Sequence, residues 1–105
     1  MRTILIALEL ARVIAGETPG CPVEAKLAVA HVAANRIEVG IKGGWFGDAD
    51  PQPIDTAVAR LWDRFPDPTD GALYLIGPGD AVKMPWLRER TGRWDCSGTW
   101  MESWR

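Results

Sequence analysis

A long hydrophobic run is missing from this sequence, and so is an excess of charge of either sign. No stretch approaches the ~20 consecutive apolar residues with which a helix crosses a bilayer, so no membrane span is predicted. Twelve Lys and Arg residues stand against 14 Asp and Glu residues, which gives a formal net charge of −2. Phosphate binding draws on clustered basic residues, so this balance argues against a nucleic-acid partner.

Cysteine is scarce, and histidine is scarcer. Cys21 and Cys96 are the two cysteines and His31 is the single histidine. They lack the spacing of a zinc site, and no metal or other cofactor is expected. The two cysteines are either buried thiols or a disulfide that ties the C-terminal tail to the loop after residue 17. The pair Asp48 and Asp50 lacks the Gly and the terminal Glu of a calcium loop, which excludes that motif.

The first residues resemble a signal peptide only superficially. Glu9 and Arg12 interrupt the apolar run, and no small-x-small cleavage site precedes the turn that follows. An amphipathic helix explains the segment better, because Glu9 and Arg12 then pair on its polar side. The sequence therefore suggests no export route.

Hydrophobic spacing predicts three helices in the first two thirds of the chain. The first is expected over about 3–16, the second over about 22–39 and the third over about 54–65. The first two should pack together through Leu10, Val13, Leu27, Ala30 and Ala34. In the third, Ile54, Val58, Leu61 and Phe65 are expected to be buried and Asp55 to point outward.

Gly and Pro recur through the last third of the chain, and this pattern predicts shorter helices and strands there. A buried strand or turn is expected over 72–76, a last short helical piece over 80–88, and an irregular tail or short hairpin over 90–105. The length suits one domain with a single core. Residues 1–105 are therefore predicted to form one mainly α domain with a short strand or hairpin region in the C-terminal half.

Glu17 is the first candidate for chemistry. It ends an otherwise apolar helical stripe, next to Gly16 and just before Pro19-Gly20. Burial raises a carboxyl pKa above its ordinary value of about 4.3, and a raised pKa suits a general acid near neutral pH. The alternative is a glutamate that turns outward on a frayed last turn.

Aromatic residues supply candidates for stacking against sugar rings. Six tryptophans are present, five of them after residue 60. Trp45 lies in a Gly- and Pro-rich loop over 40–53, while Tyr74 and Trp86 lie near turns. Core packing is the alternative role for each of them.

A polar stripe runs along the second predicted helix. Glu24, His31 and Asn35 share one side of it and are candidates to border a substrate cleft. A surface or boundary histidine with satisfied hydrogen bonds is the alternative for His31.

Several of these segments together resemble a known family. They are Leu-Ala-Arg-Val-Ile-Ala-Gly16-Glu17, an Ala/Val-rich helix ending in Asn35-Arg36, Asp67-Pro-Thr-Asp-Gly-Ala-Leu-Tyr74, and Pro85-Trp86. In order and rough spacing they resemble the cell-wall hydrolase family of spore cortex-lytic enzymes, the SleB-type domain. The tail over 94–100 departs from that family's usual ending, as do Leu73 and Leu75 after the Gly-Ala.

The resemblance implies a small, lysozyme-like helical domain that acts on the glycan strands of peptidoglycan. Family members typically work as lytic transglycosylases that cleave between N-acetylmuramic acid and N-acetylglucosamine. The catalytic acid of the family maps onto Glu17. The resemblance thus implies an enzyme acting at the cell wall, and a monomer is expected. The sequence leaves its setting open between phage lysis, germination and wall remodelling.

A second carboxylate would be needed by a hydrolytic muramidase. Asp48, Asp50, Asp67 and Glu24 are available, but none has an apolar context comparable to that of Glu17. A transglycosylase needs no partner, because the sugar's own 6-hydroxyl attacks and one glutamate serves as acid and then as base. The sequence therefore favours transglycosylation over hydrolysis. A glycan-binding module without turnover and a small interaction protein remain as alternatives from other classes.

Overall fold

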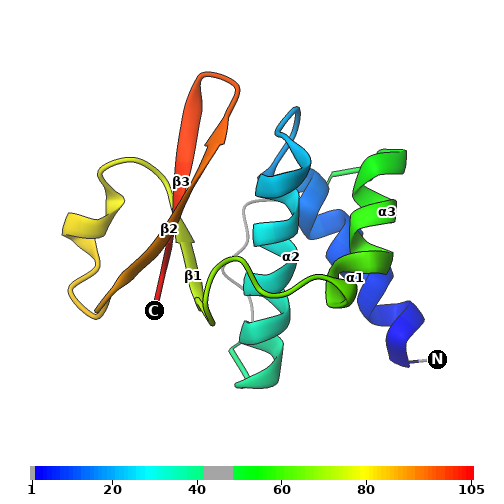
Figure 1. Cartoon of the computed structure of the whole chain (residues 1–105), viewed down its shortest axis with the longest axis horizontal. Helices are drawn as coiled ribbons and strands as arrows, with labels where there is room; N and C mark the ends of the chain where they lie inside the picture. The colour runs from blue at the N-terminus through cyan, green and yellow to red at the C-terminus, as the bar shows by residue number, and fades with distance from the viewer. Residues whose placement is uncertain (1, 42–48) are drawn as a thin grey trace.

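Three helices form the first part of the structure. This computed structural model describes residues 2–41 and 49–105, with side chains from residue 7 onward, and it is a compact mixed α/β domain (Figure 1). The helices are α1 (Arg2–Glu17), α2 (Val23–Glu38) and α3 (Pro53–Leu61), which the 3-10 turn η1 (Trp62–Arg64) extends. The three predicted helices are confirmed, with ends that differ by one residue when η1 is counted with α3.

A three-stranded antiparallel sheet forms the C-terminal half. Its strands are β1 (Tyr74–Ile76), β2 (Arg90–Cys96) and β3 (Thr99–Trp104), in the order β1-β3-β2, and the 3-10 helix η2 (Asp80–Lys83) separates β1 from β2 along the chain. Strands β2 and β3 form a hairpin that turns at Gly98, whose φ of +78° favours glycine. The hairpin expectation for the tail is confirmed, and the sheet makes the fold less purely helical than predicted.

The helix boundaries have local causes. Gly20 follows α1 with a φ of +70°, a conformation that costs a glycine little. Pro22 precedes α2 with extended backbone. At the start of α3, Gln52 and Asp55 exchange side chain-to-backbone hydrogen bonds in a capping box.

The core lies among the three helices. Its buried members are Leu10, Ala11, Val13, Ile14, Val29, Ala30, Ala33, Val58 and Ala59. Leu27 is partly buried against this cluster, and Ala34 is half-buried. The predicted packing of α1 on α2 is therefore confirmed in its main contacts.

The buried surface of α2 is wider than the predicted stripe. The ends of that stripe, Val23 and Ile37, are exposed, whereas nearly all residues from 25 to 33 are buried. The reason is the position of α2, which contacts α1 and α3 on one side and β1 and β2 on the other (Figure 1). A helix with neighbours on both sides is buried nearly all round.

The predicted buried face of α3 is confirmed at Val58 and wrong at its other positions. Ile54, Leu61 and Phe65 are exposed, and Asp55, expected to point outward, is only 2% exposed. The buried face of α3 instead carries Asp55, Val58 and Ala59. The helix is rotated in this way because Asp55 has a buried cationic partner on α2.

No helix in the described part of the chain is long and apolar enough to cross a membrane.

Candidate active site at the end of helix α1

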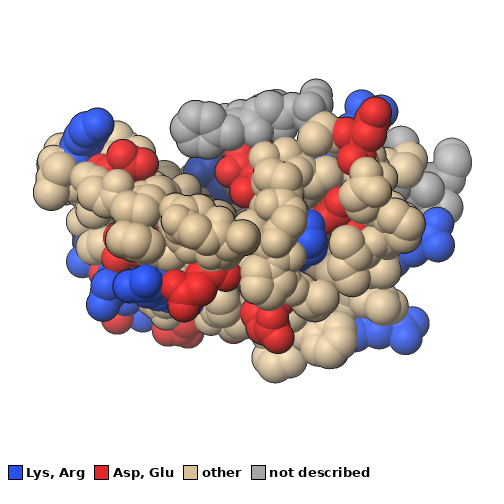
Figure 2. Space-filling model, turned by 90° about the horizontal axis from the view of Figure 1, so that it is seen from above, with Lys and Arg blue, Asp and Glu red and all other residues tan. Residues whose placement is uncertain are grey.

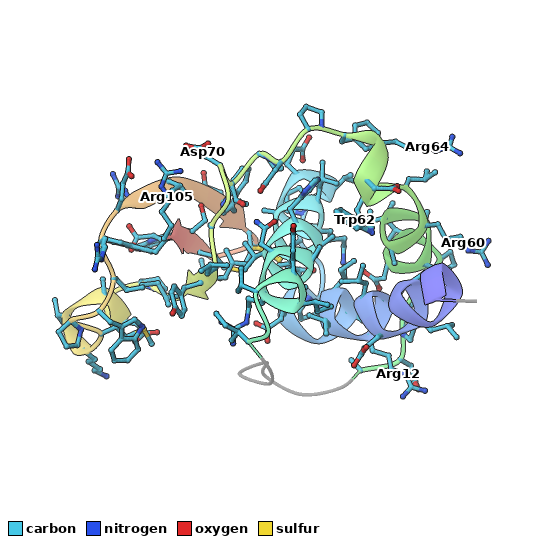
Figure 3. The ribbon with its side chains drawn as sticks, turned by 90° about the horizontal axis from the view of Figure 1, so that it is seen from below. Arg12, Arg60, Trp62, Arg64, Asp70 and Arg105 are labelled. Carbon is cyan, nitrogen blue, oxygen red and sulfur yellow. A yellow bond between two sulfur atoms is a disulfide. The ribbon has the colours of Figure 1, made fainter. Side chains whose placement is uncertain are left out.

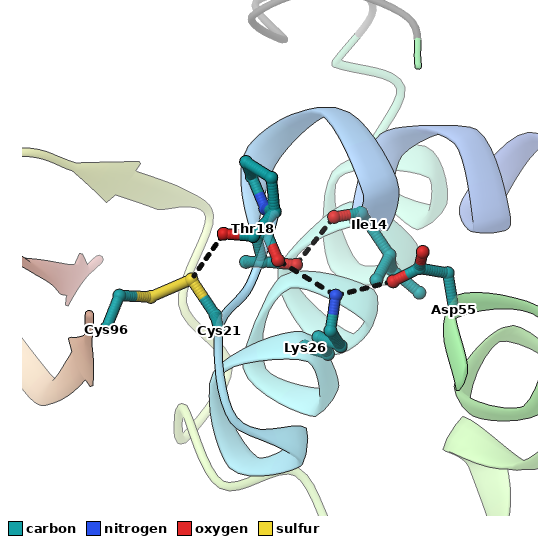
Figure 4. Close-up of a disulfide and its surroundings, with 7 residues drawn as sticks. Ile14, Thr18, Cys21, Lys26, Asp55 and Cys96 are labelled. Carbon is teal, nitrogen blue, oxygen red and sulfur yellow. Dashed lines mark hydrogen bonds and ion pairs between the residues drawn. A yellow bond between two sulfur atoms is a disulfide. The ribbon is translucent and has the colours of Figure 1, made fainter. Parts of the chain in front are cut away.

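Glu17 is the last residue of α1 and is half-buried. The residue after it is held tightly to the helix: the Thr18 amide donates a hydrogen bond to the Ile14 carbonyl at 2.9 Å, and the Thr18 hydroxyl donates to the same oxygen at 2.5 Å (Figure 4). The helix end that carries Glu17 is therefore fixed rather than frayed.

A buried lysine joins all three helices beside this point. Lys26 of α2 is 4% exposed, and its Nζ donates to the Thr18 carbonyl at 2.8 Å and to Asp55 Oδ1 at 2.5 Å (Figure 4). The other carboxylate oxygen of Asp55 accepts a hydrogen bond from the Gln52 amide at 2.8 Å. Sequence reasoning missed this cluster. One local signal was present: Gln52-Pro-x-Asp55 fits a capping box, in which the Asp55 side chain turns back to the first residues of α3.

A disulfide holds the turn after Glu17 from the other side. Cys21 and Cys96 are bonded across 75 positions, with their Cα atoms 4.8 Å apart. The bond ties the α1–α2 turn to the end of β2, and so it joins the helices to the sheet (Figure 4). Of the two alternatives that the sequence left open, the disulfide is the one observed. Such bonds are typical of proteins in an oxidising environment.

The Asp67-Pro-Thr segment forms a second polar centre, at the other end of α2. Asn35 donates from its side-chain amide to Asp67 Oδ2 at 2.9 Å and to the Ala72 carbonyl at 3.1 Å. Asp67 also accepts hydrogen bonds from the Thr69 amide, the Thr69 hydroxyl and the Gly71 amide. Burial opposes ionisation of Asp67, but these hydrogen bonds outweigh it and lower the pKa of its carboxyl below 3.8.

Arg36 connects the same end of α2 to the sheet. Its guanidinium donates to the Leu73 carbonyl at 2.9 Å and lies over the Tyr74 ring, 5.7 Å from the ring centre. The segments that carry the family resemblance, Asn35-Arg36 and 67–74, are therefore in direct contact.

Stability should depend on the ionisation of Asp67. Because its pKa is lowered in the folded state, its contribution is fully present above the unfolded pKa of about 3.9 and is lost as the pH falls through the folded value. We expect the free energy of unfolding in urea to fall as the pH is lowered below about 4, and to fall less in Asp67→Asn. Asp63→Asn, an exposed carboxyl on η1, is the matched control. An equal pH dependence in Asp67→Asn and wild type would contradict this role.

His31 lies inside the domain. It is 5% exposed. The centres of its ring and of the Trp62 ring are 5.2 Å apart, with the two rings edge-to-face, and its Nδ1 is 3.9 Å from Asp67 Oδ1. Figure 3 shows Trp62 directed from the end of α3 toward the other helices. Glu24, seven residues earlier on α2, is exposed. The predicted polar stripe therefore passes from surface to interior, and this placement favours a structural role for His31.

The aromatic candidates lie in three different situations. Tyr74 is half-buried in β1 against Arg36, and Trp86 is 56% exposed after η2. The sheet lies between η2 and the three helices (Figure 1). Trp45, with most of the 43–50 loop, lies outside the described residues.

The candidates for a second carboxylate have different settings. Asp67 is engaged in its own network, Asp50 and Glu24 are exposed, and Asp48 lies outside the described residues. Figure 2 shows acidic and basic side chains interspersed over the upper face, as the small net charge suggests. Within residues 2–41 and 49–105, no group of three or more His, Cys, Asp or Glu side chains is arranged to hold a metal ion.

Comparison of the chain with known protein families, with curated proteins and with solved structures finds no match.

Proposed function

We propose that this protein cleaves the glycan strands of peptidoglycan between N-acetylmuramic acid and N-acetylglucosamine, as a lytic transglycosylase with Glu17 as its acid and base. The observation that carries the proposal is the setting of Glu17, a half-buried carboxyl on a fixed helix end.

The resemblance to the SleB-type domain supports the same proposal. The segments that carry the resemblance are distant in sequence, yet Asn35 and Arg36 bind the segment that begins at Asp67. The proposal also takes the three helices to be a lysozyme-like unit. The disulfide supports action outside the reducing cytosol, at the cell wall.

The proposed reaction needs one carboxyl group. Glu17 gives its proton to the glycosidic oxygen, and the bond from that oxygen to C1 of N-acetylmuramic acid breaks. The 6-hydroxyl of the same sugar then attacks C1, and the Glu17 carboxylate accepts the hydroxyl proton. The products are a new N-acetylglucosamine end and a 1,6-anhydromuramic end, and Glu17 returns to its starting state.

Product analysis tests this function. We expect purified peptidoglycan digested with the protein to release fragments with 1,6-anhydromuramic ends. Mass spectrometry distinguishes them, because an anhydro end is lighter by one water than a reducing end. Reducing ends alone would support a muramidase with a second carboxylate, and no released fragments would contradict glycan cleavage altogether.

A further inference from the structure

Lys26 is a buried cation that forms an ion pair with a buried carboxylate, Asp55. Moving an ammonium group out of water costs several kcal/mol, and replacing a buried ion pair by apolar residues of similar size is often neutral or stabilising. Lys26 and Asp55 are 4% and 2% exposed, and they sit at the edge of the helical core. Their stability contribution alone is therefore a weak reason for their presence.

Lys26 connects the residue that follows Glu17 to helix α3. One hydrogen bond from Nζ goes to the Thr18 carbonyl, and the other goes to Asp55, which is itself fixed to the start of α3 through Gln52. The end of α1 is thereby tied to α2 and α3 at one point (Figure 4). A displacement of this point would move the Glu17 carboxyl with it.

We propose that Lys26, held by Asp55, is a positioning residue for Glu17. It acts through the Thr18 carbonyl and, being buried, makes no contact with substrate. The inference rests on the proposed function, because it assigns Lys26 a role in the same site. Misplacing a catalytic group by about 1 Å costs up to about 100-fold in rate, so a small relaxation of the turn is enough to be measured.

The test separates positioning from stability by neutralising the pair. Lys26→Met alone leaves the Asp55 charge buried without its cation, and that variant is expected to fold poorly. The double variant Lys26→Met/Asp55→Asn removes both charges, and Asn can still accept the hydrogen bond from the Gln52 amide. It should regain much of the melting temperature, while the Thr18 carbonyl still lacks its lysine donor.

For this double variant we expect kcat on peptidoglycan to fall by about 10- to 100-fold, with KM within about two-fold of the wild-type value. Amide hydrogen exchange at Thr18 and Cys21 should become faster, because these amides donate to the Ile14 and Thr18 carbonyls of the same turn. Val58→Ala is the matched control: it weakens the core from α3 without touching the turn, and should lower the melting temperature but not kcat.

The inference is wrong if kcat recovers together with the melting temperature in the double variant. It is also wrong if Val58→Ala loses as much kcat for the same loss of melting temperature, since the effect would then be one of stability. Unchanged amide exchange at Thr18 and Cys21 would overturn it as well. A wild-type protein that releases no glycan fragments would overturn the proposed function and this inference together, whereas activity without these differences overturns the inference alone.

Discussion

A Glu17→Gln variant should fold like the wild-type protein and lose nearly all turnover on peptidoglycan. Gln keeps the size of the side chain and its hydrogen-bonding capacity, but it has no acidic proton to give to the glycosidic oxygen. General acid–base catalysis contributes about 10²–10⁴-fold, and the loss should be greater where one group acts as both acid and base. Released fragments measured by mass spectrometry, together with a thermal melt, report both properties.

Glu9→Gln is the matched control for this experiment. Glu9 is an exposed carboxyl on the same helix, two turns before Glu17, and its replacement makes the same chemical change. It should leave turnover unchanged. Full activity in Glu17→Gln would remove Glu17 from the mechanism. Loss of the cooperative melt in Glu17→Gln would show that its carboxylate is needed for folding.

The helices could be predicted because their signals are local. Apolar residues at spacings of three and four, followed by turn residues such as Gly20, are visible within a window of about 15 residues. The packing of α1 on α2 followed from the same pattern, because a short connection between two amphipathic helices brings their apolar faces together. Leu10 and Val13 are accordingly buried against Ala30.

The orientation of α3 could not be predicted in this way. Its apolar residues Ile54, Leu61 and Phe65 formed the better helical stripe, yet they are exposed. The helix instead turns Asp55 inward toward Lys26, 29 positions away in the sequence. A contact between two single charged residues leaves no periodic signal, so it becomes visible only in three dimensions.

The candidate site, too, could be predicted only where it depends on local sequence. The position of Glu17 at the end of a helix could be predicted, because it depends on α1 and the turn that follows. The groups that hold this end come from elsewhere: Lys26 from α2 and Cys96 from the far hairpin. Sequence distance likewise concealed that His31 would lie beside Trp62 and Asp67.

Breaking the Cys21–Cys96 disulfide should remove a large part of the stability of this protein. The bond closes a loop of 75 positions. In the chain-entropy model, a loop of that length restricts the unfolded state by about 4.5 kcal/mol at 25 °C. Folded domains are stable by about 5–15 kcal/mol, so the reduced protein should lie near its unfolding transition. Urea unfolding with and without dithiothreitol measures this difference.

The Cys21→Ser/Cys96→Ser double variant shows whether the loss comes from the bond itself. It should unfold at the same lower urea concentration as the reduced wild type, and dithiothreitol should have no further effect on it. Because the bond connects the turn after Glu17 to β2, the hairpin should lose amide protection before the helical core around Ile14 does. A loss below about 1 kcal/mol would contradict the entropic argument. It would mean that the packing of α2 on β1 and β2 holds the sheet to the helices without the covalent bond.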